Sequence, residues 1–97
     1  MLEEHDYYIK LYDYYGTLLT LKQQKYFEDY YFYNLSLSEI SENYNLSRNA
    51  IHKSIKETKE LLEYYEDKLK LIDKSKKIQE LIKNLDLDIQ EKIKEWI

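Results

Sequence analysis

The sequence predicts an all-α fold, and its composition carries the prediction. The 97 residues include no proline and one glycine, the residues that most often end helices or form hairpin turns. The aliphatic residues are 15 leucines and 10 isoleucines with one alanine and no valine, and 35% of the chain is charged. This length holds one small domain, or one domain with a short appendage, and excludes a multidomain enzyme.

Two absences narrow the class of protein further. The chain has no cysteine, which excludes disulfides, thiolate nucleophiles and cysteine-based zinc fingers. Residues 1–6 are acidic where a signal peptide would be basic and then apolar, and no apolar run approaches the roughly 18 residues of a membrane span. We therefore expect a cytoplasmic protein without membrane insertion.

Two helices are expected before residue 34. Apolar side chains at helical spacing predict the first over residues 3–15, and Gly16 follows where a left-handed residue would end it. Thr20 and Gln23 have the spacing of a capping box and predict the start of a second helix, which should end near Asn34. The side chains expected on the buried faces of these helices are Tyr8, Leu11, Tyr12, Tyr15, Phe27, Tyr30 and Tyr31.

A short third helix and a long fourth helix are expected next. Ser36 and Glu39 repeat the capping box and predict a helix to about residue 43. Asn45 then makes a tight turn, because asparagine tolerates a positive φ, and Ser47 caps the fourth helix. Apolar residues at alternating steps of four and three predict that this helix runs over residues 48–72. That seam consists of Ile51, Ile55, Thr58, Leu62, Tyr65, Leu69 and Ile72.

The outer part of the seam requires a cover. Ile51 and Ile55 belong to the chain's own core, whereas the rest of the apolar seam is covered either by the C-terminal helices or by a second chain. We favour a homodimer, because helix-turn-helix proteins that read specific sequences usually pair two half-sites. The expected partner surface is Leu62, Tyr65, Leu69 and Ile72.

This organisation divides the chain near residue 72. Residues 1–72 form a helix-turn-helix domain that includes the long helix, and residues 73–97 form a helical extension that packs on the core or on the dimer interface. Asp73 or Ser75 caps the first helix of the extension, and Asp86 or Asp88 caps the last. The apolar residues expected inward are Ile78, Leu81, Ile82, Leu85, Ile89, Ile93 and Trp96.

Residues 38–55 have the spacing of a helix-turn-helix. Ile40 and Tyr44 face inward from the first helix, and the small Ser41 lets the second helix approach closely. Leu46 is expected to fill the angle between the two helices. The second helix then presents arginine, asparagine and lysine outward, which can contact guanine, adenine and phosphate. The expected DNA contacts are Ser47, Arg48, Asn49, His52, Lys53 and Lys56.

The motif lies in a segment that resembles a known family. Residues 18–71, from LLTLKQQKYFEDYY through LSLSEISENYNLSRNAIH to LLEYYEDKLKL, look like the YlxM family of small bacterial proteins similar to sigma-factor region four. The resemblance implies a region-four-like fold and a regulatory, DNA-binding role. It also implies a part in the signal recognition particle pathway, because the family's gene tends to lie beside those of the particle's protein and receptor.

The charge distribution leaves two functions open. Net charge is −4, but residues 45–59 carry four basic side chains against one acidic side chain. A small positive face on an acidic body predicts weak to moderate DNA binding with steep salt dependence. The alternative is an interaction protein that contacts protein or RNA components of the signal recognition particle, in which Tyr64 and Tyr65 would matter more than the fourth helix's polar face.

No enzyme, cofactor, metal or small-molecule substrate is expected. The sequence has no glycine-rich phosphate loop, and neither His5 nor His52 has a second histidine or a cysteine at metal-ligand spacing. We therefore interpret His52 as a phosphate or base contact. The acidic residues Glu63, Glu66 and Asp67 are expected on a solvated helix face.

Overall fold

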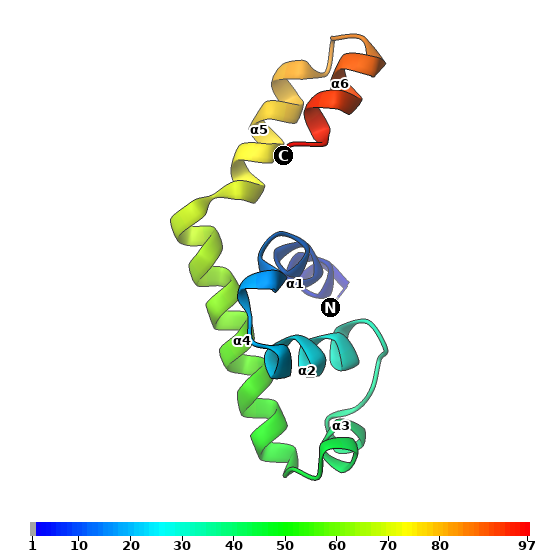
Figure 1. Cartoon of the computed structure of the whole chain (residues 1–97), viewed down its shortest axis with the longest axis vertical. Helices are drawn as coiled ribbons and strands as arrows, with labels where there is room; N and C mark the ends of the chain where they lie inside the picture. Colours follow the sequence, from blue (N-terminus) through cyan, green and yellow to red (C-terminus); the bar gives the residue numbers. More distant parts are fainter. Residues whose placement is uncertain (1) are drawn as a thin grey trace.

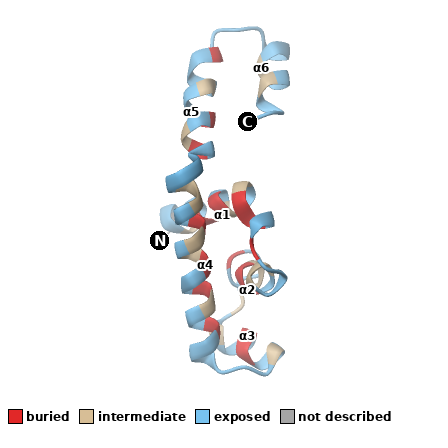
Figure 2. Cartoon of the chain, turned by 60° about the vertical axis from the view of Figure 1, so that its left-hand side comes forward, coloured by how far each residue is buried: buried red, intermediate tan, exposed pale blue. Residues whose placement is uncertain are grey.

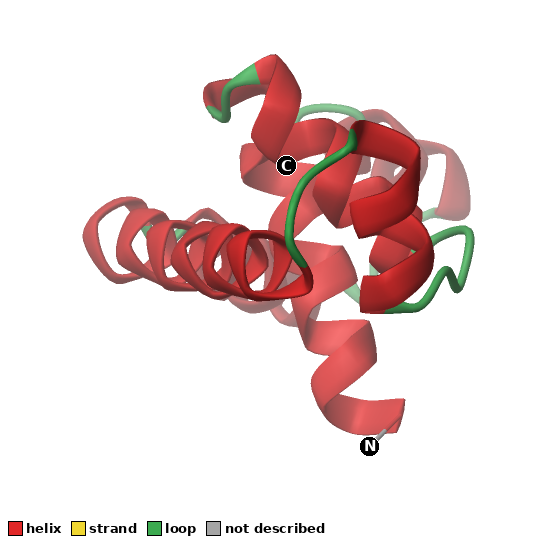
Figure 3. Ribbon diagram, turned by 90° about the horizontal axis from the view of Figure 1, so that it is seen from below, coloured by secondary structure: helices red, strands yellow, loops and turns green. Residues whose placement is uncertain are grey.

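The chain folds as a row of helices around one long helix. The computed structural model describes residues 2–97, and within that range it contains six α-helices, one short 3-10 helix and no strand (Figure 1, Figure 3). The predicted all-α fold is confirmed. The elements are α1 (Leu2–Tyr15), η1 (Gly16–Leu18), α2 (Leu21–Tyr31), α3 (Leu37–Tyr44), α4 (Arg48–Leu69), α5 (Leu71–Ile82) and α6 (Leu87–Lys94).

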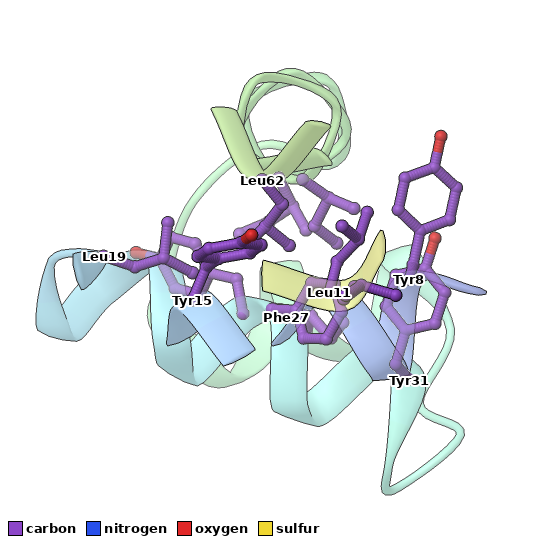
Figure 4. Packing of buried hydrophobic residues seen from close by; sticks show 12 residues of the cluster. Tyr8, Leu11, Tyr15, Leu19, Phe27, Tyr31 and Leu62 are labelled. Atoms are coloured by element: carbon purple, nitrogen blue, oxygen red, sulfur yellow. The ribbon is translucent and has the colours of Figure 1, made fainter. Parts of the chain in front are cut away.

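The core lies between α4 and the three helices α1, α2 and α3. The buried residues of α4 follow the predicted spacing, and Figure 2 shows them along the side of α4 that faces the other helices. Leu62 points into a layer that contains Leu11 and Tyr15 from α1 and Phe27 from α2 (Figure 4). Rings fill much of this layer: the Phe27 ring stacks on Tyr12, with 4.6 Å between ring centroids.

Both predicted capping boxes are present. Thr20 Oγ1 accepts a hydrogen bond from the Gln23 amide at 3.2 Å, and Gln23 Oε1 accepts one from the Thr20 amide at 2.9 Å. Ser36 and Glu39 repeat the pattern at 3.1 and 3.0 Å. These reciprocal bonds satisfy amides that have no partner within the helix, and they set where α2 and α3 begin.

Two expectations for the first two helices are wrong. Gly16 does not adopt a positive φ; it begins η1, and a Cβ on it would lie 3.1 Å from the Tyr12 ring. The glycine is therefore needed for close packing rather than for a left-handed backbone. Tyr30 is 38% exposed, and Tyr26 is buried in its place.

The long helix ends earlier than predicted. α4 stops at Leu69, because Lys70 adopts a left-handed conformation with φ 56°. Ile72 belongs to α5, where the change of direction leaves it buried against the core. The expectation of one helix over residues 48–72 is therefore wrong in its last turn.

The start of α5 is held by Glu66, a side chain from α4. Its Oε1 accepts hydrogen bonds from the Tyr15 hydroxyl at 2.5 Å and the Ile72 amide at 3.1 Å, and its Oε2 accepts one from the Asp73 amide at 3.2 Å. The Tyr15 hydroxyl in turn accepts one from the Leu71 amide at 3.1 Å. Glu66 therefore lies in a contact between α1, α4 and α5, and its expected place on a solvated face is wrong.

This environment changes two pKa values. Partial burial opposes the ionisation of Glu66, but the hydrogen bonds from Tyr15, Ile72 and Asp73 outweigh it and lower the pKa of its carboxyl below 4.5. Burial, with the hydrogen bond to Glu66, raises the pKa of Tyr15 to about 12. Both shifts favour a neutral Tyr15 donating to an ionised Glu66.

The extension after α4 is a hairpin of α5 and α6 at one end of the molecule, away from the turn between α3 and α4 (Figure 1). Four of the residues expected inward are exposed, so those expectations are wrong: Leu81 (82%), Leu85 (46%), Ile89 (44%) and Trp96 (87%). Lys70 is the N-cap of α5, so the expected cap at Asp73 or Ser75 is wrong. Asp86 is the N-cap of α6, but its side chain makes no cap hydrogen bond. None of the helices within residues 2–97 is long and apolar enough to cross a membrane.

Removing the Glu66 side chain should destabilise the fold. Glu66→Ala should lower the free energy of unfolding at neutral pH by about 1–3 kcal/mol, because the first amides of α5 lose a charged acceptor.

Glu66→Gln tests the charge alone. Since the folded-state pKa of Glu66 lies below its unfolded value of 4.5, the charge stabilises the fold above that pH, and the contribution is lost as pH falls through the folded pKa. In urea titrations, the difference between the wild type and Glu66→Gln should shrink below about pH 4; a pH-independent difference would contradict the role.

Thr58→Val should stabilise the protein. Thr58 is buried on α4, and among the described residues its hydroxyl has no hydrogen-bond partner. Replacing the hydroxyl with a methyl group of similar size removes an unsatisfied polar group and should raise the free energy of unfolding by about 1 kcal/mol. The exposed Thr17 is the control, and Thr17→Val should change stability by less than about 0.5 kcal/mol. A loss of stability in Thr58→Val would show that the hydroxyl is satisfied in solution.

Candidate nucleic-acid interface

α3, a three-residue turn and the start of α4 form the predicted helix-turn-helix. Ile40 and Ser41 are buried where α3 meets α4, and Ser41 Oγ donates to the Ser38 carbonyl at 2.7 Å. Asn45 is left-handed with φ 55°, as expected from its tolerance of this conformation. The Leu46 amide then donates to the Ser41 carbonyl at 2.9 Å and closes the end of α3.

The angle between the helices is filled differently from the prediction. Leu46 is 44% exposed, so its expected role as the buried plug is wrong. Tyr44 is partly buried against the core instead, with its ring edge-on to Tyr26 at 4.9 Å between centroids. The Tyr44 hydroxyl donates to Asp29 Oδ2 at 3.0 Å, which ties α3 to α2.

The structure places all six predicted DNA contacts at the start of α4. Ser47 is the N-cap, and its Oγ accepts a hydrogen bond from the Ala50 amide at 3.0 Å. The other five side chains belong to the first three turns of α4. All six residues are exposed: Ser47, Arg48, Asn49, His52, Lys53 and Lys56.

Four basic or titratable residues of α4 share one face, which we call the basic groove: Arg48, His52, Lys56 and Lys59. Their spacing of four, four and three residues keeps them in line on the helix. They line two neighbouring hollows of about 510 and 260 Å³, which share His52 and Leu37. The larger hollow is also lined by Glu4, His5, Tyr30, Tyr31 and Ile55. Lys53 is not part of this lining, and its ammonium lies 3.9 Å from the Glu57 carboxylate.

The first helix contributes to the far end of the basic groove, which the sequence reasoning missed. The Lys59 ammonium lies 3.5 Å from the Glu4 carboxylate and 4.5 Å from the centroid of the Tyr8 ring. His5 Nε2 is 3.1 Å from the Tyr31 carbonyl oxygen, which brings α1 against α2. Lys59 continues the helical spacing of Arg48, His52 and Lys56, so the sequence pattern could have identified it as a member of the same helix face.

The predicted partner seam is largely covered by the chain itself. Leu62 and Ile72 are buried in the core, and Tyr65 is partly buried beside Tyr15, with 6.0 Å between ring centroids. Of the four seam residues, Leu69 is the exposed one. The helices α1 and α5 thus occupy much of the surface expected to receive a second chain.

Across residues 2–97, no group of three or more His, Asp or Glu side chains is placed to hold a metal ion. The chemistry that this surface offers is recognition: one guanidinium, one carboxamide, one imidazole and lysine ammonium groups at the tip of a helix. These are hydrogen-bond donors and cations suited to base edges and phosphates.

Comparison with known proteins matches nearly the whole chain to one family. A family described as "Putative helix-turn-helix protein, YlxM / p13 like" matches residues 2–96. A UPF0122 protein of Bacillus thuringiensis is 45% identical over 85 residues, which cover 88% of this chain and 77% of that protein. One of Malacoplasma penetrans is 52% identical over 75 residues, covering 77% and 70%. One of Caldanaerobacter subterraneus is 47% identical over 87 residues, covering 90% and 68%. The resemblance expected over residues 18–71 is confirmed and extends to both helical ends.

The turn of the motif can be tested at Asn45. Asn45→Ala should lower the free energy of unfolding by about 1 kcal/mol, because alanine pays a larger cost for a left-handed backbone, whereas Asn45→Gly should not destabilise. Asn43→Ala, the same substitution at an exposed position within α3, is the control and should be neutral or slightly stabilising. Equal losses in both alanine variants, measured by thermal unfolding, would contradict the assigned conformation.

Proposed function

The chain belongs to the YlxM / p13-like helix-turn-helix family, and we propose that it is a regulatory protein that binds double-stranded DNA with the first turns of α4. One observation carries the proposal. Directly after a helix-turn-helix turn, α4 presents a set of exposed donors and cations: Arg48, Asn49, His52, Lys53 and Lys56. This is the position from which a recognition helix meets base edges.

The placement along α4 suits a division between base contacts and phosphate contacts. Arg48 and Asn49 stand in the first turn, at the tip that would enter the major groove. An arginine can bond guanine with two hydrogen bonds, and an asparagine can do the same with adenine. The positive end of the α4 dipole adds to the attraction for phosphate.

Lys53 and Lys56 supply the phosphate side of the interface. Arg48 and Lys56 are eight residues apart, so the line from one to the other runs about 12 Å along the helix, which is close to the width of the major groove. Lys56 and Lys53 therefore lie where the flanking backbone would pass. Lys59 already pairs with Glu4, so we expect a smaller contribution from it.

The overall charge limits the affinity. The net charge of −4 repels DNA at a distance, and residues 45–59 hold only four of the 15 basic residues, against one acidic residue. We therefore expect weak to moderate binding that falls steeply with salt, because each neutralised phosphate releases counterions.

The second candidate is an interaction protein that contacts components of the signal recognition particle. The exposure of Tyr64 on α4 and of large apolar side chains on α5 and α6 favours a protein or RNA partner. Tyr64 is the cleaner probe of this role, because Tyr65 is partly buried against Tyr15. Tyr64→Ala should disrupt such a complex in co-purification from lysate, with or without nuclease, whereas substitutions of Arg48 and Lys53 should not.

DNA binding is tested by capturing fragmented genomic DNA on the purified protein across a salt series. The variant Arg48→Ala, Lys53→Ala should lose enrichment of defined fragments and bind at least about tenfold more weakly, since each contact of this kind is worth about 1–3 kcal/mol. The matched control is Lys22→Ala, Lys25→Ala, which removes the same charge from exposed positions of α2 outside the candidate contacts. Far-UV circular dichroism should be unchanged in both. Equal binding by the two variants, or unselective retention by the wild type, would reject the proposal.

A further inference from the structure

The hairpin of α5 and α6 leaves its largest apolar side chains in solvent. Leu81 is 82% exposed, Leu87 75% and Trp96 87%, while Ile72, Ser75 and Ile82 are the residues of the hairpin that are buried. Large apolar groups gathered on a small element mark an interaction surface, since a chain that acts alone rarely leaves so many uncovered.

The apolar residues of the hairpin also have the spacing of a helix bundle. On α6 and just beyond it, Ile89, Ile93 and Trp96 follow each other at steps of four and three. On α5 and the turn after it, Ile78, Leu81 and Leu85 stand at steps of three and four. Two helices that pack only on each other cover one side of such stripes, whereas a four-helix bundle covers them fully.

We propose that this surface binds the same surface of a second copy, so that two α5–α6 hairpins form a four-helix bundle. Charge favours a second copy as the partner. Residues 71–83 carry four lysines against two acidic residues, and residues 86–95 carry four acidic residues against two lysines. A bundle in which α5 lies beside the partner's α6 therefore brings a segment of charge +2 against one of charge −2 at each new contact.

The net charge of the hairpin supports the same choice. Residues 71–97 sum to zero, whereas residues 1–70 carry the whole net charge of −4. Two hairpins therefore approach without net repulsion, while two acidic bodies repel each other. A strongly acidic or basic partner would find no opposite net charge on this surface.

The base of the hairpin is held in a defined position. The Glu66 carboxylate and the Tyr15 hydroxyl bond the first amides of α5, and the Tyr14 hydroxyl donates to the Ile97 carbonyl at 3.4 Å. The surface lies at the end of the molecule away from the basic groove (Figure 1). The pairing therefore leaves the groove open, and the inference does not depend on DNA binding.

Sedimentation equilibrium of the full chain tests the pairing. The wild type should approach the mass of two 12.0 kDa chains as concentration rises. The variant Leu81→Gln, Ile89→Gln, with one exposed position on each stripe, should raise the dissociation constant at least about a hundredfold, because the bundle would lose two leucines and two isoleucines from its core. Both positions are exposed in the single chain, so the fold should be retained. The control is Leu21→Gln on α2, where the leucine is 74% exposed and lies outside the hairpin; this variant should associate like the wild type.

The single tryptophan gives a direct readout of the surface. Trp96 is exposed in the single chain, so its emission should shift to longer wavelength when the wild type or Leu21→Gln is diluted. The variant Leu81→Gln, Ile89→Gln should show the long-wavelength emission at every concentration. A wild type that sediments as one chain up to about millimolar concentration, or a double variant that stays dimeric, would overturn the proposal.

A charge exchange tests which helices meet. Lys74→Glu, Lys76→Glu gives residues 71–83 a charge of −2, and Glu91→Lys, Glu95→Lys gives residues 86–95 a charge of +2. Each variant alone should associate more weakly than the wild type, and an equimolar mixture should form mixed dimers, because unlike segments then face each other. If Leu81→Gln, Ile89→Gln dissociates but the mixture of charge variants does not associate, the placement of α5 beside the partner's α6 is wrong.

Discussion

The buried stripe of α4 determines where the other helices of the body lie. Ile51, Ile55 and Leu62 take up one side of the helix, and α1, α2 and α3 all pack against that side. The rest of the helix surface is mostly exposed, and its first turns hold the candidate DNA contacts, several of which border the hollows that residues of α1, α2 and α3 also line. Because one helical periodicity sets both sides, the core also orients the recognition residues. A shift in the register of the stripe would turn Arg48 and Lys56 away together.

The sequence could predict what is encoded locally. Ser36 and Glu39 are three residues apart, Asn45 tolerates its own backbone conformation, and the seam repeats at fixed steps, so α2, α3 and the first six turns of α4 follow from short segments. The end of α4 is different. Lysine has no preference for the left-handed conformation that Lys70 adopts, and Glu66 is held by Tyr15, which lies 51 residues away. No pattern within the long helix carries that contact.

The same distinction applies to the candidate site. Its six residues share one segment whose spacing places them on an exposed helix tip, and the structure exposes them all. The remaining lining of the basic groove was missed because Glu4, His5 and Tyr31 reach it from two other helices. The pairing of Lys59 with Glu4 joins residues 55 positions apart. The exposure of Leu46 has a related cause, since Tyr44 and Tyr26 fill the space that a local reading assigns to the leucine.

The proposed hairpin pairing bears on how two copies would meet DNA. Helix dipoles favour an antiparallel arrangement of adjacent helices. If α5 and the partner's α6 run antiparallel, the twofold axis that relates the two copies is parallel to the helices of the bundle. Both bodies then lie at the same end of the bundle, with both α4 tips directed the same way. Each copy is 25 × 24 Å across its long axis, so two bodies side by side separate the tips by a few tens of Å. Successive major grooves on one face of DNA are about 34 Å apart. Pairing through the hairpins leaves the basic groove uncovered and doubles the number of DNA contacts in each complex. A protein of net charge −4 would in this way gain affinity for DNA without a larger positive surface.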